Sequence, residues 1–262
     1  KQKQAKTKTA WPNRADPRID PAPMGTRQEK TKNATSVDIA WSFGIATLVV
    51  IYAITLPGQS GHKILVATAG VIWSVRLGVF LLKDRVMKHS KEDGRYAALR
   101  THWGEKASFN FFFFYQAQGI VALLFSLPIL SAMTSQSSNS FLVLGICVWV
   151  ISVTGETIAD NQLATFRSMR QNQGKTCRNG LWRFSRHPNY FFEWLHWWSY
   201  VLLGQGSALT WLGPPLMLLF LFRFTGIPYT EIQAVKSRGD DYRNYQKTTN
   251  VFFPWFPRDD NK

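Results

Sequence analysis

Long apolar runs alternate with short polar segments along most of the chain. Four of these runs have about the ~20 residues that a helix needs to cross the hydrocarbon core of a bilayer. They cover residues 37–56, 64–82, 109–130 and 141–159, and two shorter runs follow at 189–205 and 209–224. The pattern predicts an all-α fold, a polytopic transmembrane helical bundle with six spans, or seven if a further segment dips into the membrane and returns.

The basic residues gather in alternate connections between these runs. The segments before residue 37, from 83 to 108, from 160 to 188 and after 224 hold 9, 7, 6 and 6 Lys and Arg, whereas residues 57–63 hold only Lys63. Cytoplasmic loops of membrane proteins carry an excess of positive charge. We therefore expect an integral multi-pass membrane protein with both termini on the cytosolic side. The bacterial cytoplasmic membrane is favoured, and the endoplasmic reticulum is the alternative.

Composition divides the chain into three parts. Residues 1–35 are basic and contain four prolines among mixed charges, which predicts a disordered cytosolic tail. Residues 36–257 form the predicted transmembrane domain, and residues 258–262 form a short C-terminal tail. The aromatic, proline-broken stretch at 251–257 is typical of an anchor at the membrane interface.

The formal charge of +15 would also suit a nucleic-acid-binding protein. The basic clusters, however, alternate with apolar runs instead of forming one soluble face, so we expect no nucleic acid as a partner. Cys147 falls in an apolar run and Cys177 in a basic loop. We interpret both cysteines as thiols and expect no metal site.

A few ionisable residues lie inside the apolar runs, where each costs several kcal/mol if it faces lipid. These residues are Asp38, Arg76, Glu156, Glu193 and Arg223. We expect them to face the bundle interior, although Asp38 and Arg223 lie near span ends and could reach the interface instead.

Two helical stripes of polar residues indicate where a ligand would bind. The stripe on the fourth run consists of Glu156, Asp160 and Arg167, and that on the fifth consists of Asn189, Glu193, His196 and Tyr200. Each set recurs at helical spacing, so its members share one face of a helix. Hydrogen bonds between helices are the alternative explanation. Two stripes that converge on the basic side favour a polar ligand that binds from that side.

The loop between the two stripes is rich in arginine. It contains Arg178, Arg183, Arg186 and His187, and a helix is predicted to begin after Pro188. Arginine side chains and helix N-termini both bind phosphate groups. Because the chain has no glycine-rich nucleotide-binding pattern, side chains within the bundle would have to hold a nucleotide.

The segment GLWRFSRHPNYFFEWLHWW, residues 180–198, resembles the signature of the steroid 5-alpha-reductase family, above all its bacterial members. The similarity extends over roughly residues 36–257. Its further matches are Val37, Asp38, Trp41, Arg76, Asp93, Arg95, Tyr96, Gln118, Tyr242 and Tyr245. The resemblance implies a helical membrane enzyme that binds NADPH within the bundle and reduces the C=C bond of an enone lipid, with hydride going to the β-carbon and a proton to the α-carbon.

The resemblance also implies roles for particular residues. Asn189 with Glu193, and Asp160 with Arg167, fall where family members contact the cofactor. Asp38 falls on an acidic residue that helps to polarise the substrate ketone. Either Asp38 or Glu193, kept protonated by burial, could donate a hydrogen bond to the ketone and stabilise the enolate.

The chain departs from the family pattern at three places. Val37 and Asp38 stand where eukaryotic members have Gln and Glu, Trp73 stands where they have an assisting Tyr, and Phe192 stands where the family usually has Gly. Tyr115 is a replacement candidate for the assisting Tyr by its chemistry alone. We predict Asp38, Tyr115 and Glu193 as catalytic residues.

The predicted NADPH-binding residues are acidic, basic, amide and phenolic side chains on the cytosolic side of the bundle. They are Asp84, Arg95, Glu156, Asp160, Arg167, Arg178, Arg183, Arg186, His187, Asn189, Tyr190, Glu193, Arg223, Tyr242 and Tyr245. The expected partners are a hydrophobic small-molecule substrate, a steroid or another enone lipid, and membrane lipid. We expect a monomer.

Three other functions are compatible with the Arg-His-Pro-x-Tyr motif. They are reduction of another lipid, an S-adenosylmethionine-dependent carboxyl methyltransferase of the isoprenylcysteine type, and a lipid carrier without catalysis. S-adenosylmethionine has no phosphate groups, so the arginines around the motif favour NADPH.

Overall fold

The computed structural model describes residues 34–57, 60–87, 92–224 and 226–258. All regular structure within these ranges is helical, and they contain no strand, which confirms the all-α prediction. The predicted N-terminal tail lies outside the described residues except for Ala34 and Thr35. Both are buried, and they bond to residues ahead of α4: the Ala34 N–H donates to Glu92 Oε1 at 2.7 Å, and Thr35 Oγ1 accepts from the Asp93 N–H at 2.8 Å.

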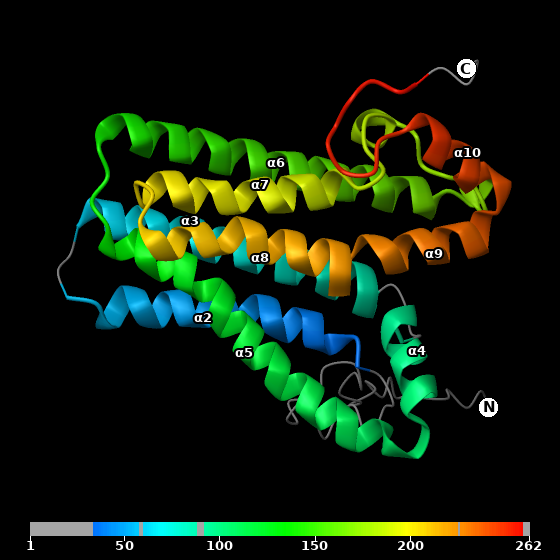
Figure 1. Ribbon diagram of the computed structural model, residues 1–262, viewed down its shortest axis with the longest axis horizontal. Coiled ribbons are helices and arrows are strands. Elements are labelled where there is room, and N and C mark those ends of the chain that lie inside the picture. The colour runs from blue at the N-terminus through cyan, green and yellow to red at the C-terminus, as the bar shows by residue number, and fades with distance from the viewer. Residues whose placement is uncertain (1–33, 58–59, 88–91, 225, 259–262) are drawn as a thin grey trace, which may run out of the picture.

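Six helices lie lengthwise beside one another and form the body of the molecule (Figure 1). They are α2 (Ser36–Thr55), α3 (Gly61–Leu81), α5 (Ala107–Thr134), α6 (Asn139–Ser168), α7 (Pro188–Leu203) and α8 (Gly213–Leu219). The other elements are α4 (Gly94–Trp103), α9 (Ile227–Arg238), α10 (Asp240–Thr248) and two π-helical turns, Leu82–Met87 and Phe220–Phe224. Single 3₁₀ turns at Gly104–Lys106, Arg170–Asn172, Gly180–Arg183 and Ala208–Leu212 complete the described helices.

Five stretches of helix are long and apolar enough to cross a membrane. They are Ser36–Thr55, Gly61–Met87, Gly94–Thr134, Asn139–Ser168 and Ala208–Arg238. The protein is therefore an integral membrane protein by the length and composition of its helices. Helix α7 has 16 residues, fewer than the ~20 that cross a full hydrocarbon core, so the count of six spans stays a prediction.

The described basic segments lie at the same end of the bundle. Figure 1 shows α4, the end of α6, α9 and α10 gathered there, whereas the turns from α2 to α3, α5 to α6 and α7 to α8 lie at the opposite end. This arrangement agrees with the alternation of charge along the sequence. We call this end the basic end.

Helices α6 and α7 pack closely because α6 presents small residues to its neighbour. A Cβ atom on Gly155 would lie 2.5 Å from the ring of Phe192, and one on Gly145 would lie 2.7 Å from Leu203. Ser152 and Ala159, on the same helix, are fully buried. Small residues let two membrane helices approach closely, so α6 and α7 hold their polar stripes against each other.

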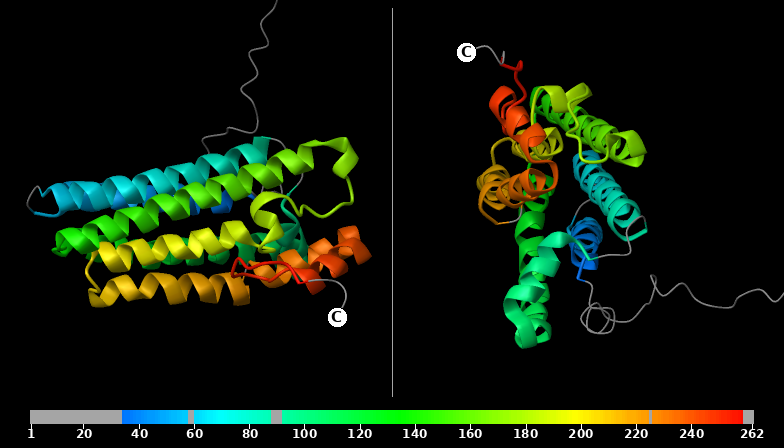
Figure 2. Two further views of the ribbon diagram at one scale, coloured as in Figure 1. Left: turned by 90° about the horizontal axis from the view of Figure 1, so that it is seen from above. Right: turned by 90° about the vertical axis from the view of Figure 1, so that its right-hand side faces the viewer.

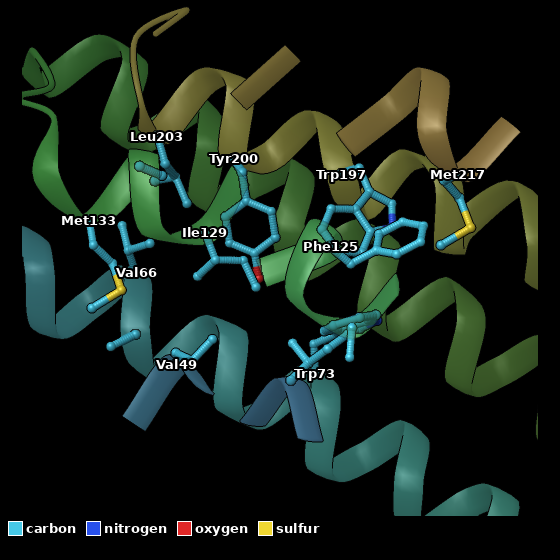
Figure 3. Close-up of a cluster of buried hydrophobic side chains, with 14 of the residues drawn as sticks. Val49, Val66, Trp73, Phe125, Ile129, Met133, Trp197, Tyr200, Leu203 and Met217 are labelled. Atoms are coloured by element: carbon cyan, nitrogen blue, oxygen red, sulfur yellow. The ribbon is translucent and has the colours of Figure 1, made fainter. Parts of the chain in front are cut away.

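Aromatic side chains fill the centre of the bundle. Trp73 from α3, Phe125 from α5 and Trp197 from α7 meet there, with Tyr200 beside them, and all four are buried (Figure 3). The ring centroids of Trp73 and Trp197 are 5.2 Å apart, and those of Phe125 and Trp197 are 4.9 Å apart. Figure 2 shows the arrangement of the long helices from above and along the bundle.

Helix α5 crosses the bundle at an angle, and its first half packs against α4 (Figure 1). A second hydrophobic cluster forms there around Val37, Tyr96 and Phe111, and Tyr115 packs against it. The predicted catalytic Tyr115 therefore belongs to the junction of α4 and α5.

Candidate functional site

The motif that begins at Gly180 folds into a compact turn anchored on α6. Gly180 has φ of 59°, and a Cβ there would collide with the side chain of Gln162. Trp182 Nε1 donates to the Ala159 carbonyl at 2.9 Å. The turn leads directly into α7, which begins at Pro188 as predicted. Asn189 therefore lies on the first turn of α7 and faces α6.

Helices α3, α6 and α7 contribute to a buried polar cluster that we call the carboxyl cluster: Arg76, Glu156, Asp160, Asn189 and Glu193. The Arg76 guanidinium lies 2.6 Å from Glu156 Oε1 and donates to Asp160 Oδ2 at 2.6 Å. Asn189 Nδ2 donates to Asp160 Oδ1 at 3.2 Å. The acidic residues are between 4% and 7% exposed, so both polar stripes turn inward, as predicted.

The carboxyl cluster is incompletely hydrogen-bonded. Asn189 Oδ1 is buried without a hydrogen-bond donor among the described residues; Glu193 Oε1 and Glu156 Oε2 are also buried without one, apart from the contact between their two carboxyl groups. A buried polar atom without a partner costs about 1–3 kcal/mol. Two of the three carboxyl groups also share the Arg76 guanidinium. Such unsatisfied groups beside a cavity are typical of a site that binds a polar ligand.

Trp73 holds one oxygen of Glu193. Its Nε1 atom donates to Glu193 Oε2 at 3.0 Å. The Trp73 ring in turn stacks on His196, with ring centroids 4.5 Å apart and an interplanar angle of 17°. The tryptophan that replaces the family's tyrosine is thus a hydrogen-bond donor to Glu193.

A second ionic group, which we call the Asp38 cluster, forms where α2, α4 and the π-helical turn after α3 meet. Asp38 accepts hydrogen bonds from Arg95 Nη2 at 2.6 Å, from the Tyr96 hydroxyl at 2.5 Å and from Arg85. Asp93 accepts from Arg95 Nε at 3.1 Å. Two guanidinium groups and a phenol therefore hold Asp38 as a carboxylate. This differs from our expectation that Asp38 could be a protonated donor.

Two adjoining cavities open beside these clusters. Cavity 1, about 190 Å³, is lined by both clusters and by apolar side chains of α5 and α8 such as Phe125 and Met217. Cavity 2, about 240 Å³, lies toward the basic end. Five residues line both: Phe80, Arg85, Asp160, Asn189 and Tyr190. A long ligand could occupy both cavities across this shared boundary.

Cavity 2 has more cationic than anionic side chains in its lining. Its lining includes Arg85, Arg167, Arg186 and Arg238, against the carboxylates of Asp84 and Asp160. Arg167 and Arg238 come from α6 and α9 and are close enough to repel each other electrostatically. The hydroxyl of Thr176, also on this wall, is buried without a partner among the described residues. These donors suit an anionic group such as a phosphate.

The far wall of cavity 2 is a hydrogen-bonded network around Glu231, which we call the Glu231 network. Glu231 Oε1 accepts from Arg186 Nε at 3.1 Å and from the Tyr242 hydroxyl at 2.7 Å, and it lies 2.9 Å from His187 Nε2. Glu231 Oε2 accepts from Gln246 Nε2 at 2.5 Å. The network ties the loop before α7 to α9 and α10.

Burial shifts the pKa of several groups around cavity 2. It lowers the pKa of His187 below its ordinary value, although the contact with Glu231 opposes the shift. Burial raises the pKa of Cys177 and of Tyr245, and burial together with the hydrogen bond to Glu231 raises that of Tyr242. His187 is therefore neutral near pH 7, the two tyrosines are donors, and Cys177 is a thiol.

Most predicted site residues line one of the two cavities. These are Asp38, Asp84, Arg95, Glu156, Asp160, Arg167, Arg186, His187, Asn189, Tyr190, Glu193, Tyr242 and Tyr245. Among the residues that the structure describes, no group of three or more His, Cys, Asp or Glu side chains is placed to hold a metal ion.

The structure places four predicted site residues away from the lining of both cavities. Arg178 turns outward and donates to Asp241 Oδ1 at 2.9 Å, and Arg183 and Arg223 are exposed. Tyr115 packs in the junction of α4 and α5. The three arginines fit the charge of the basic end better than a ligand contact.

Five residues of the site are absent from the predicted site residues: Trp73, Arg76, Arg85, Thr176 and Arg238. Arg76 was expected to face the bundle interior but was given no role in the site, although an arginine inside an apolar run needs an acidic partner and two lie on the neighbouring stripe. Arg85 and Arg238 resemble ordinary basic loop residues in the sequence. Trp73 and Thr176 carry no charge, and only their positions in space reveal them.

A family model described as "Protein of unknown function (DUF1295)" matches residues 26–249. The chain belongs to this family. The family is related to steroid 5-alpha-reductase-like membrane proteins, which agrees in part with the resemblance found in the motif at 180–198. No curated protein and no solved structure matches the chain.

Proposed function

We propose that this member of the family is an NADPH-dependent oxidoreductase that reduces the C=C bond of an enone lipid, such as a 4-ene-3-ketosteroid. The observation that supports this proposal most strongly is the adjoining pair of cavities. One combines apolar walls with an unsatisfied acid and amide, and the other is cationic. A dinucleotide matches both cavities, because its phosphates would suit the arginines of cavity 2 and its amide-bearing ring would suit the acid and amide of cavity 1.

The residues present fit NADPH. The free acceptor atoms of Asn189 and Glu193 suit the N–H groups of a nicotinamide carboxamide. Arg167, Arg238 and the free hydroxyl of Thr176 suit phosphate oxygens. Bound NADPH would supply the hydride that adds to the β-carbon of the enone.

The protein's own groups orient the reactants and exclude water. Trp73 fixes one oxygen of Glu193, and Arg76 fixes Glu156 and Asp160, so the acceptors are rigid before a ligand binds. The apolar side chains of α5 and α8 on cavity 1 would hold the hydrophobic substrate in a dry environment. Of the predicted acids, Glu193 is better placed than Asp38 to hold a proton, because Asp38 already accepts from two arginines and a tyrosine.

We further propose that the protein acts as a monomer in a bacterial cytoplasmic membrane. A carboxyl methyltransferase that uses S-adenosylmethionine remains the second candidate, because it shares the Arg-His-Pro-x-Tyr motif. The cationic lining of cavity 2 disfavours it, since S-adenosylmethionine has no phosphate to meet those arginines. A lipid carrier would show no preference among cofactors.

Thermal unfolding of detergent-purified protein tests the proposal. A ligand at ~100 times its dissociation constant adds about 2.7 kcal/mol to the free energy of unfolding, so a binding cofactor raises the melting temperature. We expect NADPH to stabilise the protein more than NADH, and S-adenosylmethionine to have no effect. Stabilisation by S-adenosylmethionine alone would assign the protein to the methyltransferases. Turnover of a panel of 4-ene-3-ketones with NADPH then tests the substrate class.

Arg167→Ala examines the phosphate site. We expect this variant to weaken NADPH binding at least about tenfold and to leave NADH nearly unchanged, because only NADPH carries the 2′-phosphate. Arg183→Ala is the matched control, since Arg183 is an exposed arginine away from both cavities. An equal loss for both cofactors in Arg167→Ala contradicts the role of Arg167.

A further inference from the structure

The substrate oxygen needs a hydrogen-bond donor, and the residues expected to provide one are already engaged. Trp73 replaces the tyrosine of the family pattern and donates its N–H to Glu193. Asp38 accepts hydrogen bonds from three side chains, so no proton is left for it to donate. The proposed function assigns the free oxygen of Glu193 to the cofactor amide, so the charged donors left on the wall of cavity 1 are arginines.

Arg85 and Arg95 both line cavity 1 and retain unused donors. Arg95 uses Nε and Nη2 on Asp38 and Asp93, and Arg85 uses Nη1 on the same two carboxylates. Neither Nη1 of Arg95 nor Nη2 of Arg85 bonds to another described residue. A guanidinium carries five N–H groups, so each arginine can bind a carboxylate and still donate to a ligand.

The charges of the Asp38 cluster balance before a ligand arrives. Two arginines face two aspartates, so the cluster carries no net charge at the edge of the membrane. Asp38 and Asp93 also hold the guanidinium planes in fixed positions. Donors fixed in this way stabilise negative charge as it develops, without the cost of reorganisation.

We propose that the guanidinium groups of Arg85 and Arg95, held by Asp38, polarise the substrate ketone and stabilise its enolate. This inference rests on the proposed function and assigns Arg95 to the substrate instead of the cofactor. Bound NADPH would supply the hydride that forms a C–H bond at the β-carbon; the C=C electron pair would shift to make the enolate, and its oxygen would gain negative charge opposite the guanidinium groups. One proton taken up from bulk solvent would then bond to the α-carbon, which would give the saturated ketone and NADP⁺.

Binding of two matched inhibitors tests the inference without turnover. One is a steroid with a carboxylate in place of its 3-ketone, which mimics the enolate charge, and the other is the corresponding primary carboxamide. Isothermal titration with NADP⁺ present measures both affinities. We expect the wild-type protein to prefer the carboxylate by about tenfold or more, as for hydrogen bonds to charged groups.

Substitutions then identify the donor. We expect Arg95→Gln and Arg85→Gln each to lose most of this preference and Arg95→Lys to keep part of it. Asp38→Asn should increase the preference, because it removes a negative charge beside the site. Arg100→Gln is the matched control on α4: Arg100 pairs with Glu92, lies over Phe111 and does not line cavity 1.

Two results would overturn the inference. One is a carboxylate preference that survives in both glutamine variants, and the other is an unchanged or smaller preference in Asp38→Asn. Stabilisation by NADPH is measured for every variant as a check on folding. If NADPH stabilises the wild-type protein but the carboxylate is not preferred, the inference about Arg85 and Arg95 fails and the proposed function stands. If NADPH does not bind, both the inference and the proposed function fail.

Discussion

The carboxyl cluster and the Glu231 network contain the same kinds of side chain but differ in how completely they are hydrogen-bonded. Around Glu231, both carboxylate oxygens have donors, and Arg186 further donates to the carbonyls of Gln246 and Thr249. In the carboxyl cluster, three buried oxygens have no hydrogen-bond donor among the described residues, apart from the contact between the carboxyl groups of Glu156 and Glu193. Satisfied polar networks stabilise a fold, whereas unsatisfied ones cost stability and are retained where a ligand completes them. We therefore interpret the Glu231 network as structural and propose the carboxyl cluster as part of the ligand-binding site.

Substitution of Glu231 in one cluster and of Glu193 in the other should give the largest difference between an effect on stability and an effect on turnover. Glu231→Ala leaves Arg186, His187 and Tyr242 without their acceptor, and breaking a buried ionic network costs about 3–5 kcal/mol. We expect a strongly lowered melting temperature in detergent even without a ligand. Glu231→Gln keeps an acceptor oxygen, so its melting temperature should fall less than that of Glu231→Ala. A Glu231→Ala protein that melts like the wild type would show that this network is not scaffold.

Glu193→Gln should have the opposite effect: it should change stability little and reduce turnover strongly. The amide keeps the size of the side chain and an acceptor oxygen for Trp73, and it removes a carboxyl group that has no ion-pair partner among the described residues, so the free energy of unfolding should change by no more than about 1 kcal/mol. Turnover of a 4-ene-3-ketosteroid with NADPH should fall about 100-fold or more, as when one preorganised group is lost from a site. Melting temperature and turnover are measured on the same preparation. Normal turnover in an unstable protein would reverse the assignment of the two clusters.

The sequence predicted the helical framework well because apolar runs and basic loops follow directly from membrane physics. The run at 141–159 became α6, which continues to Ser168 and brings Arg167 to cavity 2 as expected. The run at 209–224 was predicted less well. There the chain forms α8, a π-helical turn and α9 in succession, and α8 begins at the Gly-Pro-Pro sequence.

The sequence could not predict which residues of the basic end are bound to other protein groups and which are left to contact a ligand. Arg167 and Arg186 look equivalent as arginines near one motif, yet Arg186 is bound to Glu231 and two carbonyls while Arg167 lines cavity 2 near Arg238. Glu231 lies 44 residues from His187 along the chain, and only the fold brings them together. Whether an arginine donor is already hydrogen-bonded within the protein depends on partners that are distant in the sequence.

The contact between α6 and α7 offers a prediction of intermediate size, because it carries most of the carboxyl cluster. Gly155→Ala would place a methyl group 2.5 Å from the Phe192 ring, and overpacking of this kind costs about 1–3 kcal/mol. We expect a lower melting temperature and weaker stabilisation by NADPH, since α7 must shift relative to α6. The second substitution Phe192→Ala should restore both.

Gly119→Ala is the matched control for that experiment. Gly119 lies within α5, and a Cβ there would meet nothing within 4 Å. The change should be neutral or slightly stabilising, because alanine favours helix more than glycine by about 1 kcal/mol. If Gly155→Ala behaves like Gly119→Ala, the two helices are not packed tightly enough to position the carboxyl cluster.

The smallest expected effect is a pH dependence that belongs to the Glu231 network alone. Because burial lowers the pKa of His187, the unfolded chain binds a proton at a pH where the folded protein does not. The unfolded state then holds more protons, so stability rises with pH and falls as the pH drops through about 6.5, the ordinary histidine pKa. Between pH 7.5 and 5.5 we expect the wild-type protein to lose about 1 kcal/mol more than His187→Gln, measured as the difference between their melting-temperature profiles. Parallel profiles would mean that His187 takes up its proton equally well in both states, and that Glu231 compensates fully for burial.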